Sequence, residues 1–231
     1  MTVLLLVRHG RTAANASGTL AGWTPGVTLD DKGREQATAL AARMAGIPVA
    51  CVVTSPLERC QETADHLLAD RPADRHVDDR LGECHYGDWT GEELKTLAKD
   101  PLWKVVQSHP SSVTFPGGES MRAMQSRAVD AVRDWNARLG DDSTWIAVSH
   151  GDVIKAIIAD ALGLHLDQFQ RLQVDPCSLT AIRYTELRPF VLRLNDTGGS
   201  VDALMPPPRR RGRRTKATSD AAVGGGAGSA S

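Results

Sequence analysis

The sequence of 231 residues has few cysteines and no long apolar runs. Its four cysteines form no C-x-x-C pair and no regular framework, which argues against a disulfide scaffold or a zinc knuckle and favours a reducing compartment. No apolar stretch approaches the length of a membrane span, and the first residues lack the cationic region of a signal peptide. We therefore expect a cytoplasmic protein without a membrane partner.

The net charge of −1 hides an uneven distribution of charge along the chain. The C-terminal stretch after Met205 begins with Pro-Pro-Pro, ends in Gly, Ala and Ser, and has almost no large apolar side chains to bury. Only Asp220 balances its cationic residues, so the rest of the chain is acidic; these residues are Arg209, Arg210, Arg211, Arg213, Arg214 and Lys216. We predict one folded domain over 1–204 and a disordered tail over 205–231.

Short apolar runs alternate with stretches of helical periodicity, and 13–29 has the Gly, Thr and Ala content of a loop. This alternation predicts an α/β fold: a three-layer sandwich whose central sheet is mostly parallel and is flanked by helices. We expect strands over 1–7, 50–54, 75–78, 144–148, 179–184 and 190–194. We expect helices over 30–45, 57–69, 92–99, 103–107, 119–139, 152–162 and 166–172.

Cationic or imidazole side chains follow three of the predicted strands: Arg8 and His9, then Arg59, then His150. The carboxyl ends of parallel strands meet at one edge of a sheet, so these groups should crowd together. Such crowding is unfavourable without an anion between them, and a phosphoryl group suits the forked guanidinium of Arg. Taken singly, each residue has an ordinary explanation as a surface charge or a hydrogen-bonded core histidine. Their repetition favours an anion site.

The sequence resembles the histidine phosphatase superfamily, whose fold is phosphoglycerate mutase-like. The resemblance covers about residues 1–184 and is carried by six segments in the family's order. These are Leu6-Val7-Arg8-His9-Gly10-Arg11-Thr12-Ala13-Ala14-Asn15, Leu29-x-x-Lys32-Gly33-x-x-Gln36-Ala37, Ser55-Pro56-Leu57-x-Arg59-Cys60-x-x-Thr63-Ala64, Leu81-x-Glu83-x-x-x-Gly87-x-Trp89-x-Gly91, Phe115-Pro116-Gly117-Gly118-Glu119-Ser120 and Ser149-His150-Gly151.

The resemblance implies a role for each residue of the predicted anion site. His9 would be the nucleophile that forms a phosphohistidine intermediate. Glu83 would protonate the leaving oxygen and then deprotonate water, which requires a pKa raised toward neutrality. The remaining groups would hold the phosphoryl oxygens; they are Arg8, Asn15, Arg59, His150 and the N–H group of Gly151. For Asn15 a turn-forming role stays open, and for Glu83 that of a solvated loop acid. The family chemistry needs no metal and no cofactor.

Features of both the phosphatase and the mutase branch of the family are present. The stretch from Gly91 to Pro116 is short and lacks the paired basic residues of the mutases, and the segment from Phe115 to Glu119 resembles the phosphatases. Against this, Glu83-Cys84-His85-Tyr86-Gly87 looks like the mutase loop. Asp152 stands where mutases have Asn. We favour hydrolysis of a phosphate ester of a small metabolite and keep a phosphoglycerate mutase-type phosphomutase as the alternative.

A function of another class is a non-catalytic module that binds a phospho-ligand or a polyanion through the basic tail. Without aromatic residues between its arginines, this tail is interpreted as a non-specific electrostatic arm or a plain extension, and nucleic acid is disfavoured as a partner. The predicted strands over 179–194 leave a sheet edge that could pair with a second copy of the chain, which keeps a homodimer open.

Overall fold

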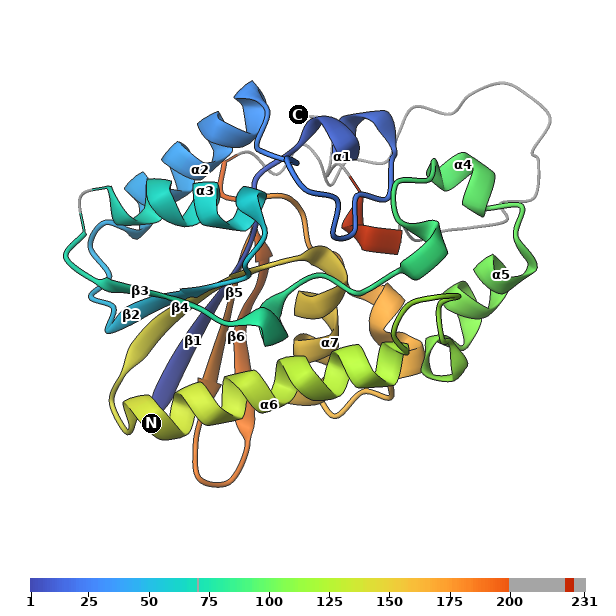
Figure 1. The fold of residues 1–231 in the computed structure, drawn as a ribbon. Coiled ribbons are helices and arrows are strands. Elements are labelled where there is room, and N and C mark those ends of the chain that lie inside the picture. Colours follow the sequence, from blue (N-terminus) through green and yellow to red (C-terminus); the bar gives the residue numbers. More distant parts are fainter. Residues whose placement is uncertain (70, 200–222, 227–231) are drawn as a thin grey trace, which may run out of the picture.

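A six-stranded mixed sheet lies between two layers of helices in the computed structural model, which describes residues 1–69, 71–199 and 223–226 (Figure 1). The strands are β1 (Thr2–Arg8), β2 (Cys51–Thr54), β3 (Asp74–Val77), β4 (Thr144–Ser149), β5 (Leu179–Tyr184) and β6 (Pro189–Asp196), in the order β3-β2-β4-β1-β5-β6. The first four strands in this order are parallel, whereas β5 is antiparallel to β1 and β6 to β5. The predicted α/β sandwich with a mostly parallel sheet is confirmed.

The central strand β1 is buried on both faces of the sheet. Its Leu4 and Leu6 belong to one apolar core, and its Leu5 and Val7 belong to the other. Helices α2 (Asp31–Met44) and α3 (Glu58–Leu68) cover one face, and α6 (Met121–Leu139) and α7 (Gly151–Ala161) cover the other (Figure 1). Burying such a side chain contributes roughly 1.5–3 kcal/mol, so the apolar run fixes the position at which Arg8 and His9 leave the sheet.

The longer helices begin at side chains that cap their first turns. Asp30 accepts a hydrogen bond from the N–H of Gly33 at the start of α2, and Ser120 accepts one from Ala123 at the start of α6. Two short helices, α4 (Leu94–Leu97) and α5 (Pro101–Ser108), fall within or close to the predicted ranges. The predicted helix over 166–172 is a 3-10 helix, η4 (Leu166–Arg171).

One helix lies where the sequence predicts a loop. Helix α1 (Ala13–Ser17) forms because the side chains of Thr12 and Asn15 cap each other's backbone N–H groups, and Gly18 ends it in a left-handed conformation. Its five residues bury no side chain. Periodicity of apolar residues therefore could not reveal it.

The predicted tail lies largely outside the described residues, which include only Val223–Gly226 of it. In this segment Val223 is buried in the larger apolar core, and Val223–Gly225 forms a short 3-10 turn, η6, that contacts α7. For Val223–Gly226 the structure thus shows a packed turn where the sequence predicts a disordered tail. The rest of the predicted tail lies outside the described residues. Within the described ranges, no helix combines the length and the apolar character that a membrane crossing needs.

Candidate active site

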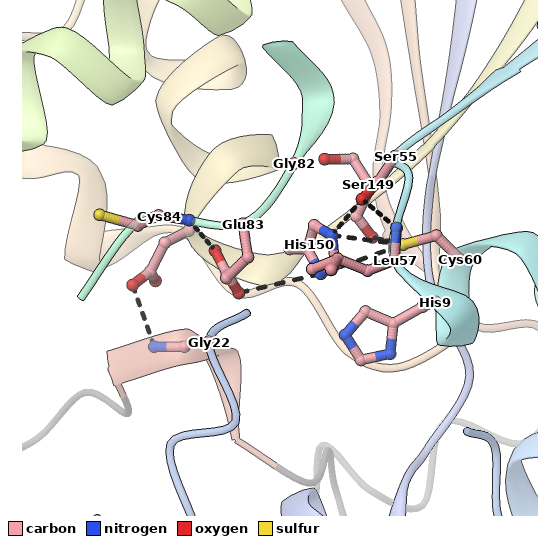
Figure 2. Close-up of polar contacts among 12 residues, drawn as sticks. His9, Gly22, Ser55, Leu57, Cys60, Gly82, Glu83, Cys84, Ser149 and His150 are labelled. Atoms are coloured by element: carbon pink, nitrogen blue, oxygen red, sulfur yellow. Dashed lines mark hydrogen bonds and ion pairs between the residues drawn. The ribbon is translucent and has the colours of Figure 1, made fainter. Parts of the chain in front are cut away.

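The candidate site lies where three neighbouring strands end. His9 follows β1, His150 follows β4, and Arg59 lies in the first turn of α3, which follows β2. The ring centroids of His9 and His150 are 5.2 Å apart. Figure 2 shows these two imidazoles and the carboxylate of Glu83 close together. The predicted convergence of the strand ends is present in the structure.

The imidazole of His9 is held in one orientation by its own loop. Its Nδ1 lies 2.8 Å from the carbonyl oxygen of Gly10, which can only accept a hydrogen bond, so Nδ1 carries the proton and Nε2 keeps its lone pair. Burial, followed by the positive charges of Arg59 and Arg8, lowers the pKa of His9 well below its ordinary value. His9 is therefore a neutral imidazole with a free basic nitrogen near pH 7.

Gly10 and Thr63 join the His9 loop to α2 and α3. A Cβ atom on Gly10 would lie 2.6 Å from the carbonyl oxygen of Gly33, so only glycine permits this approach to α2. The N–H of Gly10 donates to Oγ1 of Thr63, and that hydroxyl donates to the carbonyl oxygen of Arg59. One hydroxyl thus connects the loop of His9 with the helical turn that carries Arg59.

Arg59 is buried, and only one of its two terminal nitrogens has a partner in the described part of the chain. Its Nη2 donates to the carbonyl oxygen of Gly22 at 2.8 Å, whereas Nη1 has no hydrogen-bond partner among the described residues. A buried donor without a partner costs about 1–3 kcal/mol, and more when it is charged. Because Arg59, His9 and Glu83 line the same cavity, this guanidinium offers a donor to an anion bound there.

Arg8 is fully buried and is held by backbone carbonyl groups. Its Nη1 donates to the carbonyl oxygen of Val174 at 2.9 Å. Its Nη2 donates to Gly226 at 2.7 Å and to Gly224 at 3.3 Å. The negative charge of Glu83 is among the influences on its pKa, which burial lowers. Arg8 therefore interacts electrostatically with Glu83 and Arg59 and also contacts a segment far along the chain.

His150 is fixed by side chains at the end of β2 and the start of α3. Its Nε2 lies 2.8 Å from Oγ of Ser55 and 3.4 Å from Sγ of Cys60. Burial, with Arg59 next, lowers its pKa well below the ordinary value. Burial also raises the pKa of Cys60 to about 12, so this thiol stays protonated near pH 7 and is a weak nucleophile.

Glu83 lies in a loop that Arg127 clamps from the middle of α6. Arg127 donates to the carbonyl oxygen of Glu83 at 2.9 Å and pairs with Glu119 at 2.6 Å, while Nε1 of Trp23 also donates to that carbonyl. The side chain of Glu83 accepts from the N–H of Cys84. Burial raises the pKa of Glu83 to about 7, within the range that a proton donor needs near neutral pH.

A second buried carboxylate, that of Asp152, lies next to this group at the start of α7. Its Oδ2 accepts from the hydroxyl of Tyr86 at 2.9 Å and from the N–H of Gly224 at 3.0 Å, and its Oδ1 is 3.6 Å from Nζ of Lys155. After burial, the charge of Asp152 is the next cause of the raised pKa of Glu83. Asp152 thus disfavours the ionised form of Glu83.

The other two predicted site residues have different positions. Asn15 lines the cavity, but its Oδ1 is occupied by the N–H and hydroxyl of Thr12. Gly151 is the first residue of α7, where N–H groups have no partner within the helix. No group of three or more His, Cys, Asp or Glu side chains is placed to hold a metal ion in residues 1–69, 71–199 and 223–226.

Sequence reasoning missed three parts of the site. Arg127 lies within a helix whose pattern identifies only its apolar stripe. Asp152 departs from the mutase pattern, but no local signal in the sequence places it beside Glu83. The segment Val223–Gly226 has a composition that favours disorder. None of the three has a local pattern that could have revealed its long-range contact.

Known proteins share this fold and its motifs. The model of the histidine phosphatase superfamily (branch 1) matches residues 4–197. A glucosyl-3-phosphoglycerate phosphatase from Mycolicibacterium vanbaalenii is 34% identical over 175 residues, which are 72% of this chain and 76% of that protein. A probable phosphoglycerate mutase, GpmB, from Cronobacter sakazakii is 31% identical over 192 residues, covering 80% of this chain and 86% of the relative.

A solved structure, that of Bacillus stearothermophilus YhfR, superposes with a TM-score of 0.79 at 29% identity. The superposition covers 85% of this chain and 98% of that structure. The family match over residues 4–197 includes every residue of the predicted anion site. The chain therefore belongs to the histidine phosphatase superfamily and is an enzyme of the phosphatase type.

Proposed function

We propose that the protein hydrolyses the phosphate monoester of a small metabolite through a phosphohistidine on His9, without a metal. The observation that carries this proposal is the pairing of two groups in one cavity. Nε2 of His9 keeps its lone pair, and the buried Nη1 of Arg59 has no partner among the described residues. A phosphoryl group would satisfy both: its oxygen would accept from Arg59, and its phosphorus would accept the lone pair of His9.

In the first step, Nε2 of His9 would attack phosphorus, the N–P bond would form and the ester P–O bond would break. Glu83, protonated at or below its raised pKa of about 7, would give its proton to the leaving alkoxide oxygen. In the second step, Glu83 would take a proton from water as the water oxygen attacks phosphorus. The N–P bond would then break, which releases inorganic phosphate and returns both residues to their starting states.

The phosphoryl oxygens would be held by positive charge and by fixed donors. Arg8 and Arg59 would supply charge-assisted hydrogen bonds, and His150 would donate from its ring. The amide nitrogen of Asn15 and the N–H of Gly151 at the start of α7 would complete the set. Because burial already fixes most of these groups, little reorganisation would be needed as charge develops in the transition state.

The names of the relatives support the substrate class, because glucosyl-3-phosphoglycerate and phosphoglycerates are small phosphorylated compounds. They also keep the mutase alternative in view, since the relative from Cronobacter sakazakii is named for that activity. We favour the hydrolase because the stretch between Gly91 and Pro116 lacks the paired basic residues with which the mutases hold a carboxylate.

The decisive experiment follows phosphate release and phosphoenzyme formation together, in the presence of a chelator. A screen of phosphosugars, phosphoglycerates, nucleotides and cofactor-precursor phosphates identifies the ester that is hydrolysed fastest. A radiolabelled ester should then give an acid-labile phosphoenzyme, and His9→Ala should abolish both the label and turnover. Turnover that survives in His9→Ala would refute the mechanism. Interconversion of phosphoglycerates much faster than phosphate release would favour the mutase.

A further inference from the structure

The C-terminal segment Val223–Gly226 reaches the candidate active site from far along the sequence. It is anchored by Val223, which is buried in the larger apolar core, and Gly224 lies against Leu20 and Asp152. Gly224 has a φ of +71°, and a Cβ atom there would lie 2.9 Å from Cδ1 of Leu20. The left-handed backbone conformation at this position favours glycine.

Two carbonyl groups of this segment accept hydrogen bonds from the guanidinium of Arg8, which we have proposed as a phosphate-binding group. Nη2 of Arg8 donates to Gly226 at 2.7 Å and to Gly224 at 3.3 Å. The N–H of Gly224 donates to Oδ2 of Asp152 at 3.0 Å. The segment thus pairs acceptors with a cation and a donor with an anion, as a bound ligand would.

Little space remains beside the predicted nucleophile while this segment is in place. The cavity lined by His9, Arg59, Glu83 and the segment has a volume of about 30 Å³. One water molecule needs about 10–15 Å³ of such volume, so the cavity has room for about two waters. A phosphate ester would therefore compete with Val223–Gly226 for the space beside His9.

We propose that Val223–Gly226 is an intramolecular competitor of the substrate's phosphoryl group, which must displace the segment from Arg8 before it can react with His9. The inference rests on the function proposed above for this site. A phosphoryl dianion would replace two neutral carbonyl acceptors with charged oxygens, and such hydrogen bonds are about twice as strong. Displacement by substrate is therefore feasible, and it would cost apparent affinity.

The expected size of the effect follows from tethering. A segment that belongs to the same chain as its site acts at an effective concentration on the order of 1 mM. If the free segment bound with a Kd of about 0.1 mM, the tethered segment would raise the apparent KM about tenfold, as a competitive inhibitor does at that concentration. The apparent Kd for inorganic phosphate should rise by the same factor, because phosphate competes for the same guanidinium.

The test compares the full chain with a chain ending at residue 222 and with the full-length variants Val223→Asp and Gly224→Val. Leu187→Asp is the control, because Leu187 is 85% exposed and lies away from the site. We expect KM for p-nitrophenyl phosphate and Kd for inorganic phosphate, measured by calorimetry, to fall about tenfold in the three segment variants and to stay constant in the control. A peptide of residues 219–231 should inhibit the shortened chain competitively.

Unchanged KM and Kd in folded variants would overturn the proposal. A higher KM or a loss of turnover, with an unchanged melting temperature, would also overturn it, because the segment would then build the substrate site. The phosphate Kd separates this proposal from the proposed function. If no ester is hydrolysed by either the full or the shortened chain, but Kd still falls on shortening, the hydrolase assignment fails and the competition stands.

Discussion

Oε2 of Glu83 lies 4.0 Å from Nδ1 of His150. This distance is too long for a hydrogen bond and short enough for the two charges, where present, to interact. Burial raises the pKa of Glu83 to about 7 and lowers that of His150, so near pH 7 the imidazole is neutral and the carboxyl group is protonated in about half of the molecules. The site can therefore receive negative charge with a proton available on the carboxyl group.

The pH profile should reveal the proton on Glu83. Because its pKa is about 7, the protonated form is lost as the pH rises, and kcat should fall above about pH 7. The fall should be steeper for phenyl phosphate, whose leaving oxygen needs the proton, than for p-nitrophenyl phosphate. Glu83→Gln should lower kcat by about 10²–10⁴-fold for phenyl phosphate. A profile of kcat between pH 5 and 9 that is the same for both esters would contradict this role.

The charge of Asp152 should set the pH at which kcat declines. Its charge raises the pKa of Glu83, so Asp152→Asn should lower this pKa and move the decline in kcat to lower pH. Asn still presents an oxygen to the hydroxyl of Tyr86. The matched control is Asp160→Asn, on the exposed side of the same helix, which should leave the midpoint unchanged. A shift to higher pH, or none, would refute the electrostatic coupling.

Replacing Arg59 should show whether its geometry or only its charge is needed. Arg59→Lys keeps the charge but lacks the planar fork that reaches both Gly22 and the cavity. We expect kcat/KM to fall about 10²–10³-fold, the loss typical of one fixed oxyanion donor. Steady-state phosphate release measures this loss, with Arg133→Lys as a surface control. Near-normal kcat/KM in Arg59→Lys would exclude a fork-shaped contact in the transition state.

Arg127 should act on catalysis through the position of Glu83. Arg127→Ala removes the donors to the carbonyl groups of Arg80, Gly82 and Glu83 and leaves Glu119 without its cation. We expect the free energy of unfolding to fall by about 2–4 kcal/mol and kcat to fall more than KM changes.

Urea unfolding and steady-state kinetics measure these two effects, and Arg122→Ala, on an exposed position of the same helix, is the control. In Arg127→Ala we also expect the pH at which kcat falls by half to change. This change distinguishes positioning of Glu83 from lost stability alone. If the pH profile keeps its midpoint and kcat is normal in the folded fraction, the clamp has no catalytic consequence.

The core of the site was predictable because it depends on strand ends. An apolar run followed within about five residues by His9, Arg59 or His150 is a local pattern, and parallel pairing brings such ends together. The contacts of Arg127, Asp152 and Val223 depend on packing between distant segments, for which the sequence has no periodic signal. Helix α1 also has no periodic signal in the sequence, because it is short, depends on reciprocal capping and buries no side chain.

His9, Arg59 and His150 follow strands in the middle of the sheet, whereas one wall of the cavity comes from residues 18–22. A change in this wall leaves the pairing of β2, β4 and β1 intact. Natural variation can therefore alter the choice of substrate without rebuilding the reaction centre. For protein engineering, residues 18–22 are the place to diversify when a new ester is to be accepted.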